Sequence, residues 1–135
     1  MNKRLLFWGS FFGGTAVILG AFGAHILKEK IGTEQLQVFE KGVYFQLFHA
    51  LAILFLGSIL SGKSEERLLR IAGKLFTAGI IFFSGSLYIL SCRDVLGISE
   101  WTKIIGPITP LGGLCLIGGW ILSMIYFSSK ENRKT

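Results

Sequence analysis

Four long runs of the sequence carry almost no charge, and this feature restricts most strongly what the chain can fold into. The runs are 5–27, 43–60, 71–91 and 108–129, and Lys74 is the one Asp, Glu, Lys or Arg within them. A helix needs about 20 mostly apolar residues to cross a bilayer. In lipid, only helices and closed barrels satisfy their own backbone. The sequence therefore predicts an all-α integral membrane protein, one domain of four transmembrane helices packed as a bundle.

The basic residues that flank these runs indicate that the chain contacts membrane lipid. The net charge of +6 raises the question of a nucleic-acid ligand. The basic residues gather at the ends of the apolar runs, however, and form no stripe with interleaved aromatic residues. In that place they meet anionic lipid headgroups, so we expect no nucleic acid. Trp8, Trp101 and Trp120 are expected at headgroup level, where tryptophan is enriched.

The distribution of basic residues predicts the orientation, because connections rich in Lys and Arg stay in the cytoplasm. Nine lie on the side that holds both termini: Lys3, Arg4, Lys63, Arg67, Arg70, Lys74, Lys130, Arg133 and Lys134. Five lie on the other side: Lys28, Lys30, Lys41, Arg93 and Lys103. Both termini of this multi-pass chain are therefore expected in the cytoplasm.

Small residues recur in the runs at a spacing that suits helix packing. Apolar side chains gain little from burial in lipid, so close approach through small residues holds such helices together. The expected packing positions are Gly9, Gly13, Gly20, Gly112 and Gly119. These positions serve packing within one subunit or between subunits. We accordingly expect a homo-oligomer or a complex with another membrane protein.

A set of polar residues within the runs forms the candidate ligand-binding site. Its members are His25, Gln46, His49, Ser84, Ser86, Tyr88 and Thr109. A Gln or His side chain facing lipid would leave donors unsatisfied, so these residues should face the bundle interior. We expect them in the outer half of the bundle. The two histidines should differ in depth by about one helical turn, which is close enough for a common cavity, although the sequence does not decide whether they share one.

Three interpretations of this polar set stay open. It is an internal hydrogen-bond network that locks the helices. Alternatively, it lines a pocket or half-channel for a small solute, a lipid headgroup or a proton, where histidine titrates near neutral pH. In the third interpretation, His25 and His49 are axial haem ligands. Two histidines alone are far from sufficient for that site, and no cofactor is expected.

The pattern offers little for catalysis or metal binding. No Asp or Glu lies within the four runs, which removes paired-carboxylate chemistry from the membrane. The serines have no nucleophile-elbow context, and no phosphate-binding glycine loop occurs. Cys92 and Cys115 lack CxxC spacing and a His/Cys cluster. We expect no catalytic residues, no metal site and no enzymatic activity.

Four motifs follow one another along the chain. They are Gly20-Ala-Phe-Gly-Ala-His25, Tyr44-Phe-Gln-Leu-Phe-His-Ala-Leu51, Phe83-Ser-Gly-Ser-Leu-Tyr88, and Ile108-Thr-Pro-Leu-Gly-Gly113 with Gly119-Trp120. In these motifs the chain resembles the YgdD/YwdK-like family of small bacterial membrane proteins, classified as a domain of unknown function. The resemblance covers nearly the whole chain. It implies a four-helix protein of the bacterial inner membrane, without implying an activity.

Two functions from different classes are compatible with these features. The first is binding or transport of a small solute or lipid through the outward-facing polar set. The alternative is a non-catalytic structural or accessory membrane subunit that acts through helix–helix packing. Sequence alone leaves both open.

Overall fold

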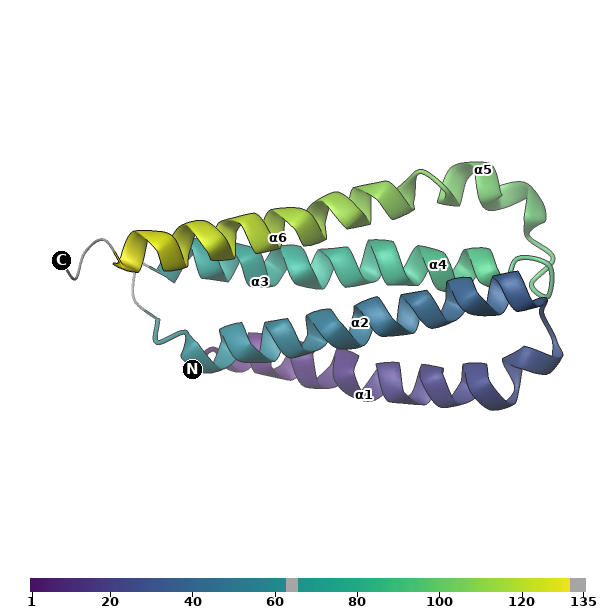
Figure 1. Cartoon of the computed structure of the whole chain (residues 1–135), viewed down its shortest axis with the longest axis horizontal. Helices are drawn as coiled ribbons and strands as arrows, with labels where there is room; N and C mark the ends of the chain where they lie inside the picture. The colour runs from purple at the N-terminus through teal and green to yellow at the C-terminus, as the bar shows by residue number, and fades with distance from the viewer. Residues whose placement is uncertain (63–65, 132–135) are drawn as a thin grey trace.

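Four helical rods lie alongside one another, and both termini lie at the same end of the molecule (Figure 1). The computed structural model describes residues 1–62 and 66–131. The rods are α1 (Lys3–His25), α2 (Thr33–Ile59), the combined α3 (Arg67–Gly79), η3 (Ile80–Ser84) and α4 (Gly85–Ser91), and α6 (Ile108–Glu131). Each rod is long and apolar enough to cross a membrane. The predicted all-α transmembrane bundle is thus confirmed.

The two connections at the end opposite the termini contain short helical segments among turns. The 3₁₀ turn η1 (Leu27–Glu29) joins α1 to α2, and η4 (Ser99–Trp101) with α5 (Thr102–Ile105) precedes α6. The α2 helix begins at Thr33, well before the apolar run that starts at 43. The Gly32 N–H donates to the Gln35 side chain at 2.8 Å and so closes the start of this helix. The first turns of α2 therefore carry its charged residues outside the apolar run.

At the end that holds the termini, Glu66 closes the connection between α2 and α3. Its side chain is 6% exposed. Its carboxylate accepts the Ser61 N–H at 2.9 Å, the Gly62 N–H at 2.9 Å and the Ser61 hydroxyl at 2.6 Å. Gly62 has φ +91°, a conformation that favours glycine. A buried carboxylate is tolerated here because backbone N–H groups satisfy it.

The described basic residues lie at both ends of the bundle. Lys3, Arg4, Arg67, Arg70 and Lys74 belong to the end that holds the termini. The predicted members Lys63, Arg133 and Lys134 lie outside the described residues, as does the side chain of Lys130.

Glycines set the closest contacts between the rods. The α1 helix packs along α2, α2 packs against the third rod, and α6 packs against α3 and η3. A Cβ on Gly9 would lie 2.7 Å from the Leu54 side chain, and one on Gly119 would lie 2.5 Å from the Phe76 ring.

The other three predicted packing glycines behave differently from one another. A Cβ on Gly112 would collide with the backbone of Phe82 and Phe83, whereas one on Gly20 would make an ordinary 3.4 Å contact. At Gly13 nothing lies within 4 Å. Gly13 thus does not pack the described helices of one chain against each other.

The third rod contains a π-helical turn at mid-length. The Gly85 N–H donates to the carbonyl of Ile80, five residues back, and to that of Phe82. A π turn accommodates one extra residue, and such turns are frequent at functional sites. The extra residue rotates all later side chains by about 100° relative to an uninterrupted α-helix. The π turn therefore determines which face of α4 packs against α2, and it directs Tyr88 toward α2.

Candidate functional site

Gln46 links three rods through its side-chain amide. It lies on α2 and is 4% exposed. Its Nε2 donates to the Phe12 carbonyl at 2.9 Å and to Thr15 Oγ1 at 2.8 Å, both on α1. Its Oε1 accepts the Tyr88 hydroxyl of α4 at 2.8 Å. Both amide N–H groups and the amide oxygen are therefore engaged by neighbouring helices.

His49 lies one helical turn further along α2 and is held on both ring nitrogens. Nδ1 lies 2.8 Å from the Phe45 carbonyl, which can only accept, so Nδ1 carries the proton. Nε2 then accepts the indole N–H of Trp120 at 3.1 Å. The expectation that Trp120 lies at headgroup level is wrong, because it lies midway along α6. Its N–H is satisfied at that depth by the histidine.

Two hydroxyl groups join α4 to α6. The oxygen atoms of Ser86 and Thr109 lie 2.7 Å apart. Because the Ser86 hydroxyl donates to the Phe83 carbonyl at 2.9 Å, the Thr109 hydroxyl is the donor between them. Ser84 is 1% exposed, and its hydroxyl has no hydrogen-bond partner in the described part of the chain. It ends the π turn and takes no part in the pairs around it.

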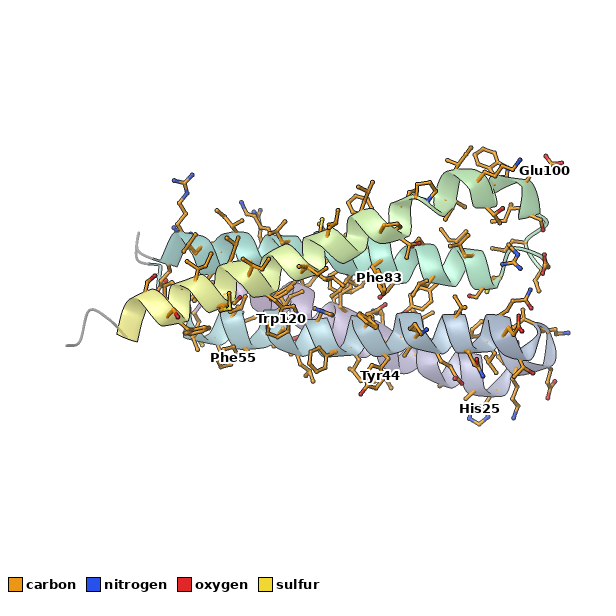
Figure 2. All side chains as sticks on the ribbon, turned by 45° about the horizontal axis from the view of Figure 1, so that its top comes forward. His25, Tyr44, Phe55, Phe83, Glu100 and Trp120 are labelled. Atoms are coloured by element: carbon orange, nitrogen blue, oxygen red, sulfur yellow. The ribbon has the colours of Figure 1, made fainter. Side chains whose placement is uncertain are left out.

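His25 does not join this set. It is exposed at the last residue of α1, and in Figure 2 it points away from the other helices near the end opposite the termini. Gly23 of α1 faces Phe39 of α2, so His49 lies about 15 Å deeper than this level at 1.5 Å per residue. The predicted difference of one turn is wrong. The early start of α2 at Thr33 accounts for the error, because it carries His49 far into the bundle.

The paired polar groups restrict what this set can do chemically. The polar atoms of Gln46, His49 and Tyr88 are committed to other helices or to the local backbone. An axial haem bond from His49 would have to displace the Trp120 N–H, and His25 lies too far away to be the second ligand. Within the described residues no group of three His, Cys, Asp or Glu side chains is arranged to hold a metal. The geometry matches an internal network that locks α1, α2, α4 and α6.

An apolar groove runs beside this network between α2 and α6. Two cavities, of about 500 Å³ and about 280 Å³, share Phe48 and Trp120 in their linings. We call them together the α2–α6 groove. Aromatic side chains form most of the wall of the larger cavity: Tyr44, Phe45, Phe48, Phe83 and Trp120. In Figure 2, Phe55, Trp120 and Tyr44 follow one another along the long axis, which gives the groove its direction.

Two polar residues along the wall of this groove, His49 and Ser123, are already paired, whereas Tyr44 lies at its outer end. His49 is bonded to Phe45 and Trp120. The Ser123 hydroxyl donates to the Gly119 carbonyl at 2.9 Å. Phe48 and Trp120 remain 54% and 45% exposed, so the groove is open on its outer side. Its surface offers an apolar chain much contact and offers a polar solute few free partners.

Comparison with known proteins places this architecture in a family. The sequence model of the family described as "Protein of unknown function (DUF423)" matches residues 19–113. The chain belongs to this family. A UPF0382 membrane protein of Staphylococcus aureus, SAB0533, is 43% identical over 123 residues, which cover 91% of this chain and 93% of the relative. The UPF0382 membrane protein YwdK of Bacillus subtilis is 42% identical over 126 residues, which cover 91% and 94%. No solved structure gives a significant match.

Membership in DUF423 confirms the predicted resemblance to YwdK-like proteins. The relatives are named as membrane proteins, and four rods are long and apolar enough to cross a bilayer. The chain is therefore an integral membrane protein. The matched segment includes Gln46, His49 and Tyr88, whereas Thr15 and Trp120 lie outside it.

Thr15 and Trp120 are the two partners in the hydrogen-bond network whose side chains sequence reasoning missed, and it did not predict the groove. Each carries a signal in retrospect. Thr15 is a hydroxyl amid the apolar and small residues of α1, and Trp120 carries a donor near the middle of the fourth run. A donor at that depth requires an acceptor on a neighbouring helix. His49 and Gln46 are among the side chains of the runs that can accept.

Proposed function

We propose that this protein is a non-enzymatic membrane protein that binds a lipid acyl chain in the α2–α6 groove. One observation carries the proposal: an elongated, aromatic-lined groove opens outward between two transmembrane helices, and His49 and Ser123, the polar side chains along its length, are already paired, with the Tyr44 hydroxyl left at its outer end. Cavities of roughly 300–1,000 Å³ are the usual size for small-molecule sites. An acyl chain needs contact area and no hydrogen bonds, which is what this groove supplies.

The length of the groove supports this ligand. Its lining on α2 extends from Tyr44 to Leu56, which corresponds to about 18 Å at 1.5 Å per residue. One leaflet contributes about half of the 30 Å hydrocarbon thickness. The groove thus extends over roughly the depth that one leaflet's acyl chains occupy. A chain lying in it would stay parallel to its neighbours in the bilayer.

The hydrogen bond between His49 and Trp120 holds the groove open. Free rotation of the indole would let its ring fall into the space between α2 and α6. The bond from Nε1 to His49 fixes the ring as a wall between the two cavities. Gly113 adds width on the α6 side, because it has no side chain and lines the larger cavity.

Filling the groove at Gly113 should abolish lipid retention. A Cβ on Gly113 would lie 3.7 Å from the Phe83 ring, an ordinary contact, so Gly113→Leu should fold with its side chain in the groove. Native mass spectrometry of protein released from nanodiscs should show one retained phospholipid per chain in wild type. In Gly113→Leu we expect at least a tenfold lower retained fraction, because the leucine occupies the chain's place.

Gly85→Leu is the matched control for this measurement. Gly85 is also a helix glycine, it lies two residues beyond Phe83, and nothing lies within 4 Å of its Cβ position. It is not among the residues that line the larger cavity. This variant should retain lipid as wild type does. Equal retention in Gly113→Leu and wild type would refute the groove as the binding place.

We further propose that the protein lies in the bacterial inner membrane with both termini in the cytoplasm. In the sequence, nine of the fourteen Lys and Arg residues fall in the two terminal segments and in or next to the connection between α2 and α3, and such an excess favours a cytoplasmic location. A fluorescent protein fused to the C-terminus should be bright, and an alkaline phosphatase fused there should be inactive. The reverse pair of results would invert the orientation.

A further inference from the structure

We infer that the bound lipid is an anionic phospholipid whose headgroup is held by Lys41 at the outer end of the α2–α6 groove. This inference rests on the proposed function and specifies its ligand. Residues 41, 44, 45 and 48 share one face of α2, because they are spaced by three, four and seven residues. Three of them, Tyr44, Phe45 and Phe48, line the groove. The fourth, Lys41, lies about one turn beyond the groove, toward the start of the helix.

The depth of Lys41 matches that of a phosphate group. Lys41 is the last charged residue of α2 before the run 43–60, so it lies at the boundary of the hydrocarbon region. Helix side chains tilt toward the N-terminus of their helix, and α2 begins at this end of the bundle. The ammonium group is therefore directed outward, away from the apolar groove, where headgroups lie.

The charge of Lys41 is available to a ligand. Its side chain is exposed, and among the described residues no carboxylate lies within ion-pair distance of it. The positions three and four residues away are Gln37, Val38, Tyr44 and Phe45, none of them acidic. Glu40 is adjacent in sequence but projects about 100° around the helix.

Three other charged residues at this end, Glu34, Arg93 and Asp94, lie at or beside a separate crevice. Arg93 lies 3.7 Å from Asp94 and lines a crevice of about 280 Å³ together with Glu34. Asp94 also accepts the Gln35 amide at 2.5 Å. Asp94 is thus engaged by Arg93 and Gln35 beside α4, whereas Lys41 lies on the groove's own face of α2.

Tyr44 supplies a second polar group at the same end. It lines the groove and is 70% exposed. Its ring extends the aromatic wall, and its hydroxyl is available to a glycerol ester or a phosphate oxygen. A groove that is apolar along its length and cationic at its mouth matches a lipid with an acyl chain and a negative headgroup.

Competition between two lipids with identical chains tests the headgroup directly. Delipidated protein in mild detergent would be mixed with equal amounts of dioleoyl phosphatidylglycerol and dioleoyl phosphatidylcholine. Native mass spectrometry would then count the two adducts. One lysine near the membrane surface favours the anionic lipid by about fivefold, and this is the ratio expected for wild type. Lys41→Gln should bring the ratio to about one while total lipid binding persists.

Lys30→Gln is the matched control, because it removes the same charge at the same end, from an exposed site beside η1. It should keep the wild-type ratio. Adding millimolar inorganic phosphate should leave the ratio unchanged, whereas a loss of preference would mean that Lys41 binds free phosphate instead. Equal binding of both lipids by wild type, or an unchanged ratio in Lys41→Gln, would overturn this inference and leave the groove standing. Failure of the groove proposal would be seen in a different experiment, as undiminished lipid retention in Gly113→Leu.

Discussion

Replacing Gly112 by alanine should cost about 1–3 kcal/mol of unfolding free energy, the range for overpacking a rigid contact. The added Cβ would lie 2.8 Å from the Phe82 carbonyl carbon and 2.8 Å from Phe83 Cα, and closer still to the Phe83 nitrogen. These are backbone atoms of the π turn, so no rotamer change relieves the clash. The α6 helix would have to move away from η3 as a body.

That movement would spread to other contacts of α6. Gly79 faces the Leu116 side chain, and Gly119 faces the Phe76 ring at 2.5 Å. Both contacts depend on the same close approach of α6 to the third rod. The hydrogen bond between Ser86 and Thr109 lies near the same contact. Steric trapping or unfolding by SDS in bicelles would measure the loss.

The neighbouring variant Gly113→Ala separates this effect from a general effect of removing glycine. Its Cβ would meet the Phe83 ring at 3.7 Å, and alanine favours a helix over glycine by about 1 kcal/mol. We expect Gly113→Ala to be as stable as wild type or slightly more stable. If Gly112→Ala matched it, α6 would not rest on the π turn as the structure has it.

The four rods could be predicted because each transmembrane helix is determined by the composition of its own segment. A helix that must satisfy its backbone in lipid leaves a long uncharged run, and 43–60 or 108–129 can be identified without knowing any neighbour. The ends of the helices were harder. The first turns of α2 from Thr33 carry Glu34, Glu40 and Lys41, so hydropathy alone starts this segment about ten residues too late.

The polar site was predictable only in part, because pairing between rods depends on rotation and depth. Gln46 and Tyr88 were expected to face inward, and they bond to each other. Their meeting depends on the π turn, which rotates α4 after Ser84 and has no clear signal in the sequence. The apolar runs place His25 and His49 at similar depths, whereas the start of α2 at Thr33 places His49 much deeper in the bundle.

The same physics explains why polar residues and the groove lie side by side. Trp120 provides aromatic wall on one face and an N–H that must be satisfied on its edge. His49 satisfies it from the interior, so this hydrogen bond holds the aromatic wall of the groove without directing the indole N–H into the groove. The geometry thus favours the internal hydrogen-bond network over a polar solute site formed by the same residues. The paired groups of the polar set shape the wall of the groove.

Replacing Gln46 by leucine should lower the unfolding free energy by about 2 kcal/mol, since three interhelical hydrogen bonds are lost at about 0.6 kcal/mol each. The largest single part should come from Tyr88, whose hydroxyl would lose its acceptor. Thr15 would suffer less, because its hydroxyl still donates to the Phe11 carbonyl at 2.9 Å. Steric trapping in bicelles would measure the change.

A double-mutant cycle with Tyr88→Phe identifies the cause. In wild type, Tyr88→Phe should be destabilising, because it leaves the Gln46 oxygen without a donor. In the Gln46→Leu background the same change should be neutral or stabilising, because it removes an orphaned hydroxyl. Gln37→Leu, at an exposed position of the same helix, should change stability little. Strictly additive effects of the Gln46 and Tyr88 substitutions would show that the amide does not join α2 to α4, and the polar set would then need another explanation for its burial.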